Sequence, residues 1–177
     1  MVAQASLVNG FTCQQGDIGL VKIGKTFDAI ISLFHVISYQ VSNHQIQLVF
    51  DNASKHLLPG GLFIFDFWYT PAVYSQKPSI RVKRMADENF EITRIAEPMV
   101  YPDQNRVDVN FTVFVRDLST NEIQSFTESH PMRHFSLPEI DIFASTHGFQ
   151  RVLAQEFLTG QAPSENTWGV SVVLRKI

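Results

Sequence analysis

The chain has 177 residues, of which 45% are hydrophobic and 18% are charged, and its formal net charge is −3. This length and composition predict one globular domain with a sizeable core, spanning residues 1–177. The weak negative net charge argues against a basic surface that would bind nucleic acid. No apolar run is long enough to cross a membrane. A single cysteine, Cys13, excludes an intrachain disulfide and a cysteine-rich metal site, which favours a reducing, cytoplasmic setting.

The first eighteen residues carry weak structural signals. Residues 1–9 have a weakly helical pattern that ends at an Asn-Gly turn, and Phe11–Gln15 is predicted to be a short strand. Gly16, Asp17 and Ile18 follow. Aspartate is common in turns because its side chain hydrogen-bonds the neighbouring backbone. On the residues alone, Asp17 is explained as well by a turn as by a ligand.

A strand–helix–strand unit is predicted between residues 28 and 67. Residues 28–34 and 62–67 are short apolar runs, typical of strands that are buried on both faces of a parallel sheet. Between them, Ser42 and Gln45 have the Ser-x-x-Gln spacing of a helix-capping box, and an apolar stripe with helical period follows. We expect Pro59-Gly60-Gly61 to stop this helix and turn the chain into the second strand of a βαβ unit.

The carboxyl ends of these two strands hold the first candidate site residues. Ligands of open α/β sheets collect at such ends, so the residues after the first strand should line a crevice: Leu33, Phe34, His35 and Val36. The second strand ends in a carboxylate followed by aromatic rings, which could orient an amine and hold a sugar or nucleotide ring: Asp66, Trp68 and Tyr69. Tyr39 could stack on the same acceptor. Purely structural roles remain the alternative for His35, Tyr39 and the two aromatic residues.

The hydrophobic period changes to two in residues 79–135. Alternating stretches separated by turn signals predict an antiparallel meander of about four strands: residues 80–85, 90–97, 107–115 and 123–135. Such an insertion is suited to act as a lid or as a dimer surface. Beyond it, Ser136 and Glu139 form a second capping box for a helix that Gly148 ends, and residues 150–158 and 168–174 are predicted to be two more strands.

Two histidines lie near the end of the predicted meander. His130 and His134 are four residues apart, but Pro131 and the strand context argue against a helical metal pair, and no Glu or Cys completes a ligand set. We therefore expect no metal. Either histidine could act as a general base, because histidine titrates near neutrality. The candidate catalytic residues are thus His130, His134 and Tyr39, with a structural or surface role as the alternative.

The order of three motifs resembles the class I S-adenosylmethionine-dependent methyltransferases. FDAIISLFHV, a helix and then HLLPGGLFIFDFW are similar to that family's fourth strand, helix and fifth strand, and CQQGDIGLV is similar to the end of its third strand. The antiparallel insertion resembles the branch that methylates amino groups of nucleotide-linked sugars. The resemblance implies an α/β fold, namely a partial Rossmann-like sheet carrying the meander. It also implies S-adenosyl-L-methionine as cofactor and a small-molecule acceptor.

The resemblance further implies a division of the cofactor site. Gly16, Asp17 and Ile18 would lie beside the adenine ring, with Asp17 accepting a hydrogen bond from its amino group. The backbone of Leu33, Phe34 and His35 would face the methionine part of the cofactor. The family's Gly-rich loop has no counterpart, because the chain contains no Gly-x-Gly-x-Gly.

We therefore expect a methyltransferase domain that lacks its amino-terminal third and binds the cofactor weakly. In the family the first strand pairs beside the FDAIIS strand, so that edge should pair with residues 11–15 or with a partner copy in a homodimer. The predicted reaction is N- or O-methylation of a small polar acceptor such as an amino sugar, and the activity of this chain on its own is left open. The alternatives are a non-catalytic interaction or assembly domain and, ranked lower, a nucleotide-sugar binding module.

Overall fold

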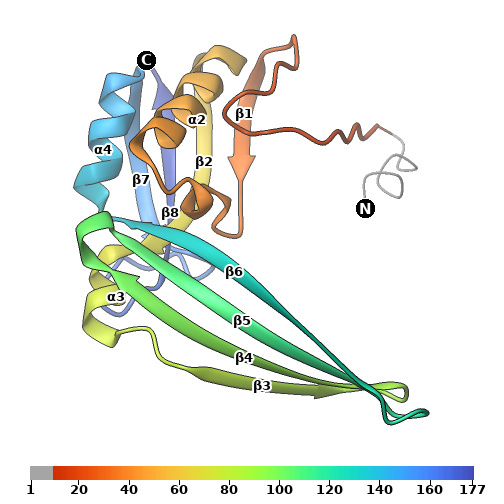
Figure 1. The fold of residues 1–177 in the computed structure, drawn as a ribbon. Coiled ribbons are helices and arrows are strands. Elements are labelled where there is room, and N and C mark those ends of the chain that lie inside the picture. The colour runs from red at the N-terminus through yellow and green to blue at the C-terminus, as the bar shows by residue number, and fades with distance from the viewer. Residues whose placement is uncertain (1–9) are drawn as a thin grey trace.

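The computed structural model describes residues 10–177, and the helix predicted over residues 1–9 lies outside this range. The strands form one sheet with both parallel and antiparallel pairs, and the described part of the chain also contains three α-helices (Figure 1). The elements are β1 (Phe27–Ser32), the 3-10 helix η1 (Val36–Tyr39), α2 (Asn43–His56), β2 (Leu57–Tyr69), α3 (Thr70–Gln76), β3 (Arg81–Ala86), β4 (Phe90–Tyr101), the 3-10 helix η2 (Pro102–Gln104), β5 (Arg106–Asp117), β6 (Ile123–Phe135), α4 (Leu137–Thr146), β7 (Phe149–Glu156) and β8 (Gly169–Lys176).

Four strands make the central sheet. β1 pairs parallel with β2, β2 pairs antiparallel with β8, and β8 pairs antiparallel with β7. Helices α2 and α4 lie on the same face of this sheet (Figure 1). Both predicted helix starts are present: the Ser42 hydroxyl accepts the Gln45 N–H at 3.2 Å, and the Ser136 hydroxyl accepts the Glu139 N–H at 3.4 Å. The full capping box forms only at Ser42, because the Glu139 side chain binds Arg133 instead of the Ser136 backbone.

An aromatic core fills the space between the helices and the sheet. Phe50 of α2 is fully buried, and its ring lies 5.7 Å from Phe63 and 5.8 Å from Phe65 of β2, measured between ring centroids. Phe143 of α4 and Phe149 of β7 approach the same ring at 6.0 Å and 6.2 Å. One ring therefore joins both helices to two strands of the sheet, and edge-to-face pairs of this kind add to the burial of apolar area.

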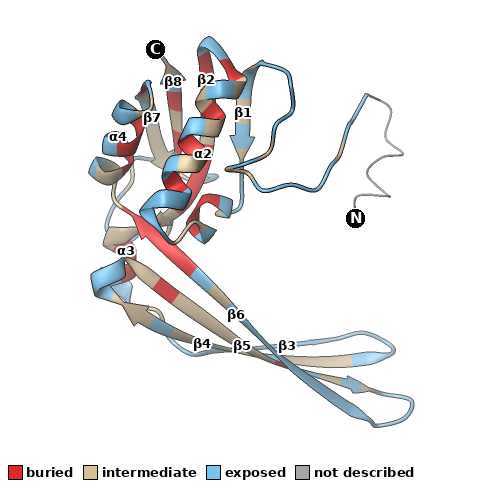
Figure 2. Cartoon of the chain, turned by 45° about the horizontal axis from the view of Figure 1, so that its top comes forward, coloured by how far each residue is buried: buried red, intermediate tan, exposed pale blue. Residues whose placement is uncertain are grey.

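The meander, defined as β3 to β6, is the antiparallel insertion that the period-two pattern predicted. Its four strands pair in sequence order, β3 with β4, β4 with β5 and β5 with β6. It joins the central sheet through two residue pairs between β6 and β2, Trp68 with His134 and Tyr69 with Phe135. From there it projects away from the core, with buried residues at its base and exposed residues toward its tip (Figure 2).

Three local predictions were wrong. Phe11–Gln15 is not a strand and pairs with no strand, so β1 has one unpaired edge within residues 10–177. β1 is not buried on both faces, because Ile31 is 60% exposed and Asp28 and Ala29 are exposed as well. Pro59-Gly60-Gly61 does not separate the helix from the strand. The helix ends at His56 and the triplet forms an irregularity inside β2, between the pairs Phe27–Leu57 and Ala29–Leu62.

The irregularity in β2 explains its two glycines and gives a testable difference between them. A Cβ on Gly61 would lie 2.9 Å from the carbonyl oxygen of Leu58 and 3.1 Å from that of Asp28, and both are backbone atoms that cannot move aside as a flexible side chain can. Gly60 has φ +79° and open space around it. We expect Gly61→Ala to lower the free energy of unfolding by about 2–3 kcal/mol through overpacking. Gly60→Ala should lower it by only about 1 kcal/mol, through backbone strain. Urea denaturation measures both, and a Gly60 variant as costly as the Gly61 variant would contradict this.

Candidate functional site

The loop that follows β1 lies between two cavities. Phe34 and His35 both have left-handed backbone, with φ 63° and 61°. This conformation is rare for residues other than glycine, and it turns the chain between β1 and η1. As a result, Leu33 and Val36 line one cavity while Phe34 and His35 line the other. The residues that the sequence placed at a crevice therefore form the partition between two crevices.

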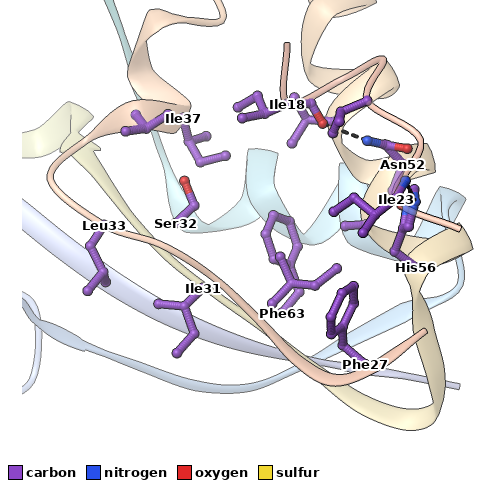
Figure 3. A pocket seen from close by; sticks show the side chains of 15 residues that line it. Ile18, Ile23, Phe27, Ile31, Ser32, Leu33, Ile37, Asn52, His56 and Phe63 are labelled. Atoms are coloured by element: carbon purple, nitrogen blue, oxygen red, sulfur yellow. Dashed lines mark hydrogen bonds between the residues drawn. The ribbon is translucent and has the colours of Figure 1, made fainter. Parts of the chain in front are cut away.

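The β1 cavity, on the first side of the loop, has a volume of about 410 Å³ and nearly apolar walls from β1, α2 and the segment 18–23 (Figure 3). Two α2 side chains hold that segment in place. The Asn52 Nδ2 donates to the Ile18 carbonyl at 2.9 Å, and the His56 Nε2 accepts the Ile23 N–H at 3.1 Å. The Ser32 hydroxyl oxygen also lines this cavity, and it is buried with no hydrogen-bond partner among residues 10–177.

The meander cavity, on the second side of the loop, is larger, about 650 Å³, and more polar. Residues of the meander line one side of this cavity, which brings together residues that are distant in the sequence. Its aromatic lining includes Trp68, Trp168 and Phe111, and three cations line it from β3 and β4, Arg81, Lys83 and Arg94. The Arg94 guanidinium lies 4.8 Å above the centre of the Phe111 ring. Aromatic faces with a few convergent charges are typical of a small-molecule site.

Tyr39 and His130, two of the three candidate catalytic residues, meet in the meander cavity. The Tyr39 hydroxyl and the His130 Nδ1 are 2.9 Å apart, and the His130 Nε2 lies 3.4 Å from the Glu128 carboxylate. Both ring nitrogens of His130 thus have partners. The sequence could not show this pairing, because ninety-one positions separate Tyr39 from His130.

Asp66, predicted to orient an amine, is not among the residues that line the meander cavity. The side chain is fully buried, and its Oδ2 accepts the backbone N–H of His35 at 3.1 Å. The same Oδ2 lies 2.6 Å from the His35 Nδ1. This is a close charge contact rather than a well-aligned hydrogen bond, and the second oxygen, Oδ1, has no partner among residues 10–177. Asp66 contacts the cavity only through His35.

The comparisons with known proteins support the motif-based resemblance. No protein-family model matches the sequence. The dTDP-3-amino-3,4,6-trideoxy-alpha-D-glucopyranose N,N-dimethyltransferase of Streptomyces venezuelae is 22% identical over 102 residues, 58% of this chain and 43% of that protein. The dTDP-4-amino-2,3,4,6-tetradeoxy-D-glucose N,N-dimethyltransferase of Saccharopolyspora spinosa is 28% identical over 118 residues, 64% of this chain and 47% of that protein. The matches thus span less than half of either relative.

The fold is also that of solved methyltransferases. The crystal structure of an S-adenosylmethionine-dependent methyltransferase from Clostridium acetobutylicum matches 98% of this chain and 67% of its own, with a TM-score of 0.78 at 20% identity. This chain is a distant homologue of the class I S-adenosylmethionine-dependent methyltransferases. The likeness to the amino-sugar branch, inferred from the insertion, is confirmed at the level of distant relationship.

The predicted cofactor residues of this methyltransferase homologue are divided by the loop. Ile18 and Leu33 line the β1 cavity, whereas Phe34 and His35 line the meander cavity. Gly16 and Asp17 are exposed and lie outside the lining of both cavities. The Asp17 carboxylate accepts the Gly19 N–H at 2.7 Å, which is the local turn contact expected from residue type. Its second oxygen makes no hydrogen bond within residues 10–177.

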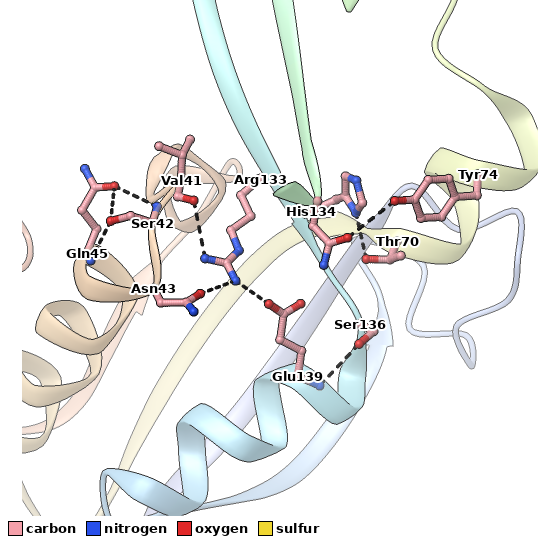
Figure 4. A network of polar contacts seen from close by, with 11 residues as sticks. Val41, Ser42, Asn43, Gln45, Thr70, Tyr74, Arg133, His134, Ser136 and Glu139 are labelled. Carbon is pink, nitrogen blue, oxygen red and sulfur yellow. Dashed lines mark hydrogen bonds and ion pairs between the residues drawn. The ribbon is translucent and has the colours of Figure 1, made fainter. Parts of the chain in front are cut away.

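The remaining candidates have mainly structural contacts. Tyr69 packs against the core and its N–H donates to the Trp168 carbonyl at 2.9 Å, so it seals the end of the sheet. His134 is fully buried and does not line the meander cavity. Its Nδ1 lies 2.9 Å from the Thr70 hydroxyl, in the polar junction between β6 and α3 (Figure 4). We therefore do not propose His134 as a base.

The burial of His134 predicts a pH dependence of stability. Burial, and secondarily the neighbouring Arg133 charge, lowers the pKa of His134 to about 4 from an ordinary value of 6.5. The unfolded chain therefore takes up a proton near pH 6.5 and the folded chain only near pH 4. The free energy of unfolding should fall by up to about 3 kcal/mol as the pH drops through that window. Denaturation of wild type and His134→Asn at several pH values tests this, and equal slopes for both proteins would rule it out.

Neither cavity holds a recognisable metal centre: within residues 10–177, no group of three His, Cys, Asp or Glu side chains is placed to bind an ion. Among the helices described, none is long and apolar enough to span a bilayer. Sequence reasoning missed several residues that shape the cavities, namely Ser32, Asn52 and His56 at the β1 cavity and Arg81, Lys83 and Arg94 at the meander cavity. The alternation in β3 marked which side chains share a face, but not that this face would meet the loop after β1.

Proposed function

We propose that this chain binds S-adenosyl-L-methionine in the β1 cavity and transfers the methyl group to an amine held in the meander cavity. The loop of residues 33–36, which separates the two cavities, is called the partition loop below. The observation that carries the proposal is the loop itself, whose outer residues, Leu33 and Val36, line one cavity and whose inner residues, Phe34 and His35, line the other. A donor in one cavity and an acceptor in the other would meet at this loop. Transfer in such an arrangement depends mainly on proximity and orientation, which the chain's own residues supply.

The β1 cavity suits the less polar part of such a cofactor. Its walls are mostly aliphatic and aromatic, and the unpartnered Ser32 hydroxyl offers one hydrogen bond to a ligand. Ile18 and Leu33 would contact the bound molecule, and the free oxygen of Asp17 would reach the adenine amino group from the adjoining turn. When bound, the cofactor supplies a methyl group already activated by the sulfonium charge. The residues of the chain then need only to orient the two reactants and to remove one proton.

The meander cavity suits an acceptor with a ring and a negative charge. Trp68 and Trp168 offer aromatic faces, and Arg81, Lys83 and Arg94 offer charge-assisted hydrogen bonds. The two curated relatives are named for dTDP-linked amino sugars. A nucleotide-linked amino sugar is therefore the acceptor class that we propose. Tyr39 and His130 are placed to contact it.

The decisive test is methyl transfer to a defined acceptor. We would incubate the chain with S-adenosylmethionine and dTDP-3-amino-3,4,6-trideoxy-α-D-glucopyranose and follow the methylated product by mass spectrometry. Replacing the cavity-lining pair, Lys83→Gln with Arg94→Gln, should raise the acceptor KM about tenfold or more, because each charged hydrogen bond contributes roughly 1.5–3 kcal/mol. Arg84→Gln is the matched control, since Arg84 directly follows the cavity-lining Lys83 on β3 and does not itself line the cavity. No product with wild type, or equal effects in both variants, would count against the proposal.

A second candidate, an assembly domain, is favoured by the exposed side of β1. Ile31 is 60% exposed and Phe34 is 75% exposed, beside a strand edge that is unpaired within residues 10–177. Such an edge is a template for another strand, so we propose self-association as a homodimer through β1. Sedimentation over a wide concentration range should show dimers that Ile31→Lys abolishes and Ile142→Lys on α4, where the residue is 64% exposed, does not. A monomer at all concentrations would remove this candidate.

A further inference from the structure

Asp66 and His35 form a dyad at the bottom of the meander cavity. Asp66 belongs to the end of β2 and is fully buried, while the His35 side chain is 30% exposed and lines the cavity. We propose that His35 is the general base that accepts the proton of the acceptor amine, and that Asp66 is its positioning residue. This inference rests on the proposed function and names the residues that would perform its proton transfer.

Asp66 contacts both the backbone and the ring of His35. Its Oδ2 accepts the backbone N–H of His35 at 3.1 Å and lies 2.6 Å from the Nδ1 of the same residue. The other oxygen has no partner among residues 10–177, so the buried carboxylate has the imidazole as its nearest charge partner. A buried carboxylate without compensation is costly, and it favours the neutral tautomer whose N–H is on Nδ1, the nitrogen that faces it. His35 has a left-handed backbone conformation, which is strained for a residue other than glycine, and the contacts with Asp66 help to maintain it.

The other faces of the ring are apolar and leave little freedom. The Phe157 and Trp68 rings lie edge-on at 6.1 Å and 6.4 Å between centroids. A Cβ on Gly169 would lie 3.2 Å from the His35 Cε1, so β8 approaches the imidazole closely where it has no side chain. Among these neighbours, from β2, β8 and the segment after β7, Asp66 is the charged one. The imidazole is therefore held in one orientation toward the cavity.

The two histidines of the cavity differ in the nitrogen that remains available. In His130, Nδ1 is engaged by Tyr39 and Nε2 by Glu128. In His35, Nδ1 has the Asp66 carboxylate as a close charge contact at 2.6 Å, and Nε2 makes no hydrogen bond within residues 10–177. A general base needs an unprotonated nitrogen that its substrate can reach, with the other nitrogen held by an orienting group. His35 meets both conditions.

The proton balance of the step is simple. The amine lone pair forms the new N–C bond, and the C–S bond breaks with its electron pair remaining on sulfur. The nitrogen then carries a positive charge and one proton more than the product amine. That proton passes to His35 Nε2, and the resulting imidazolium is stabilised by the Asp66 carboxylate. The base returns to its starting state when the proton leaves to solvent through the open side of the cavity.

The first test needs no acceptor. Long-range ¹H–¹⁵N spectra of the uniformly labelled protein at neutral pH should show the His35 proton on Nδ1, with Nε2 bare, and Asp66→Asn should remove this tautomer preference. A proton found on Nε2 in wild type would overturn the dyad. Because the readout concerns only the free protein, it is independent of whether the acceptor has been chosen correctly.

The second test measures transfer to the dTDP-amino sugar named above. His35→Gln should lower kcat about 100-fold or more, the usual contribution of a general base. Its affinity for S-adenosylhomocysteine should change less than twofold. His44→Gln, at an exposed position of α2, is the matched control. Asp66→Asn should lower kcat and change the shape of the pH–rate profile, which a purely structural role would not do.

The outcomes separate the two proposals. A wild type that binds S-adenosylhomocysteine and transfers methyl groups, with a His35→Gln variant that keeps more than a tenth of the rate, would overturn the base role and leave the proposed function standing. A wild type that neither binds the ligand nor transfers would overturn the proposed function and the base role together. If Asp66→Asn fails to fold, His35→Gln and the wild-type spectra still decide the question.

Discussion

Phe50→Ala is expected to lower the free energy of unfolding by about 3–5 kcal/mol, the range for a buried aromatic truncated in a tight core. Phe50 is fully buried and its ring contacts aromatic residues from α4, β2 and β7 at centroid distances of 5.7–6.2 Å. Those neighbours belong to different elements and cannot collapse into the space together. Urea denaturation followed by tryptophan fluorescence and circular dichroism gives the value.

An exposed phenylalanine provides the matched control for this substitution. Phe126 lies on β6 and is 47% exposed, so Phe126→Ala removes the same atoms from a half-solvated site. We expect a loss below about 1 kcal/mol, as is usual for surface changes. Similar losses at both positions would mean that the aromatic cluster around α2 is not the centre of the core.

Arg133→Met is expected to cost about 3–5 kcal/mol, because it breaks a buried ion pair and leaves the partner charge uncompensated. The Arg133 side chain, 8% exposed, donates to the Glu139 carboxylate at 2.6 Å and to the Asn43 side chain at 2.7 Å (Figure 4). It therefore joins the base of β6 to the starts of α2 and α4. Loss of this junction should also loosen the meander against the core, which hydrogen exchange of β6 amides would report.

The double variant Arg133→Met with Glu139→Met tests the cause of that loss. Buried pairs are often replaced by apolar residues of similar volume at little cost, since both desolvation penalties disappear together. We expect the double variant to recover most of the stability that Arg133→Met loses. A double variant as unstable as the single one would show that the contacts to Asn43, and not the ion pair, hold the junction.

Local signals in the sequence predicted most of the elements. The helix caps at Ser42 and Ser136 depend on neighbours three residues away, and both N-cap hydrogen bonds are present. The meander strands follow from their own alternation and from turn residues. β1 shows where this reasoning fails: its apolar run predicted burial on both faces, yet burial depends on what other segments cover, and Ile31 remains exposed.

The candidate site was predictable in its position and not in its contacts. The rule that ligands collect at strand ends placed Leu33 to Val36 at a crevice. Two consecutive left-handed residues, Phe34 and His35, decide which side chain enters which cavity, and no residue-type preference signals that conformation there. The contacts of Asp66 could not be predicted for a similar reason. Its partner, His35, is thirty-one positions away, so only the folded chain shows that the carboxylate contacts His35.

Calorimetric titration with S-adenosylhomocysteine tests the central claim, that the partition loop and the β1 cavity form a cofactor cleft. Wild type should bind with a dissociation constant in the micromolar range, roughly −8 kcal/mol. Leu33→Asp should abolish binding, because it puts a charge into the apolar wall, and Leu153→Asp should not. Both leucines are partly exposed, 39% and 45%, and Leu153 lies on β7 at the far edge of the sheet. No heat of binding with wild type at millimolar ligand would contradict the claim.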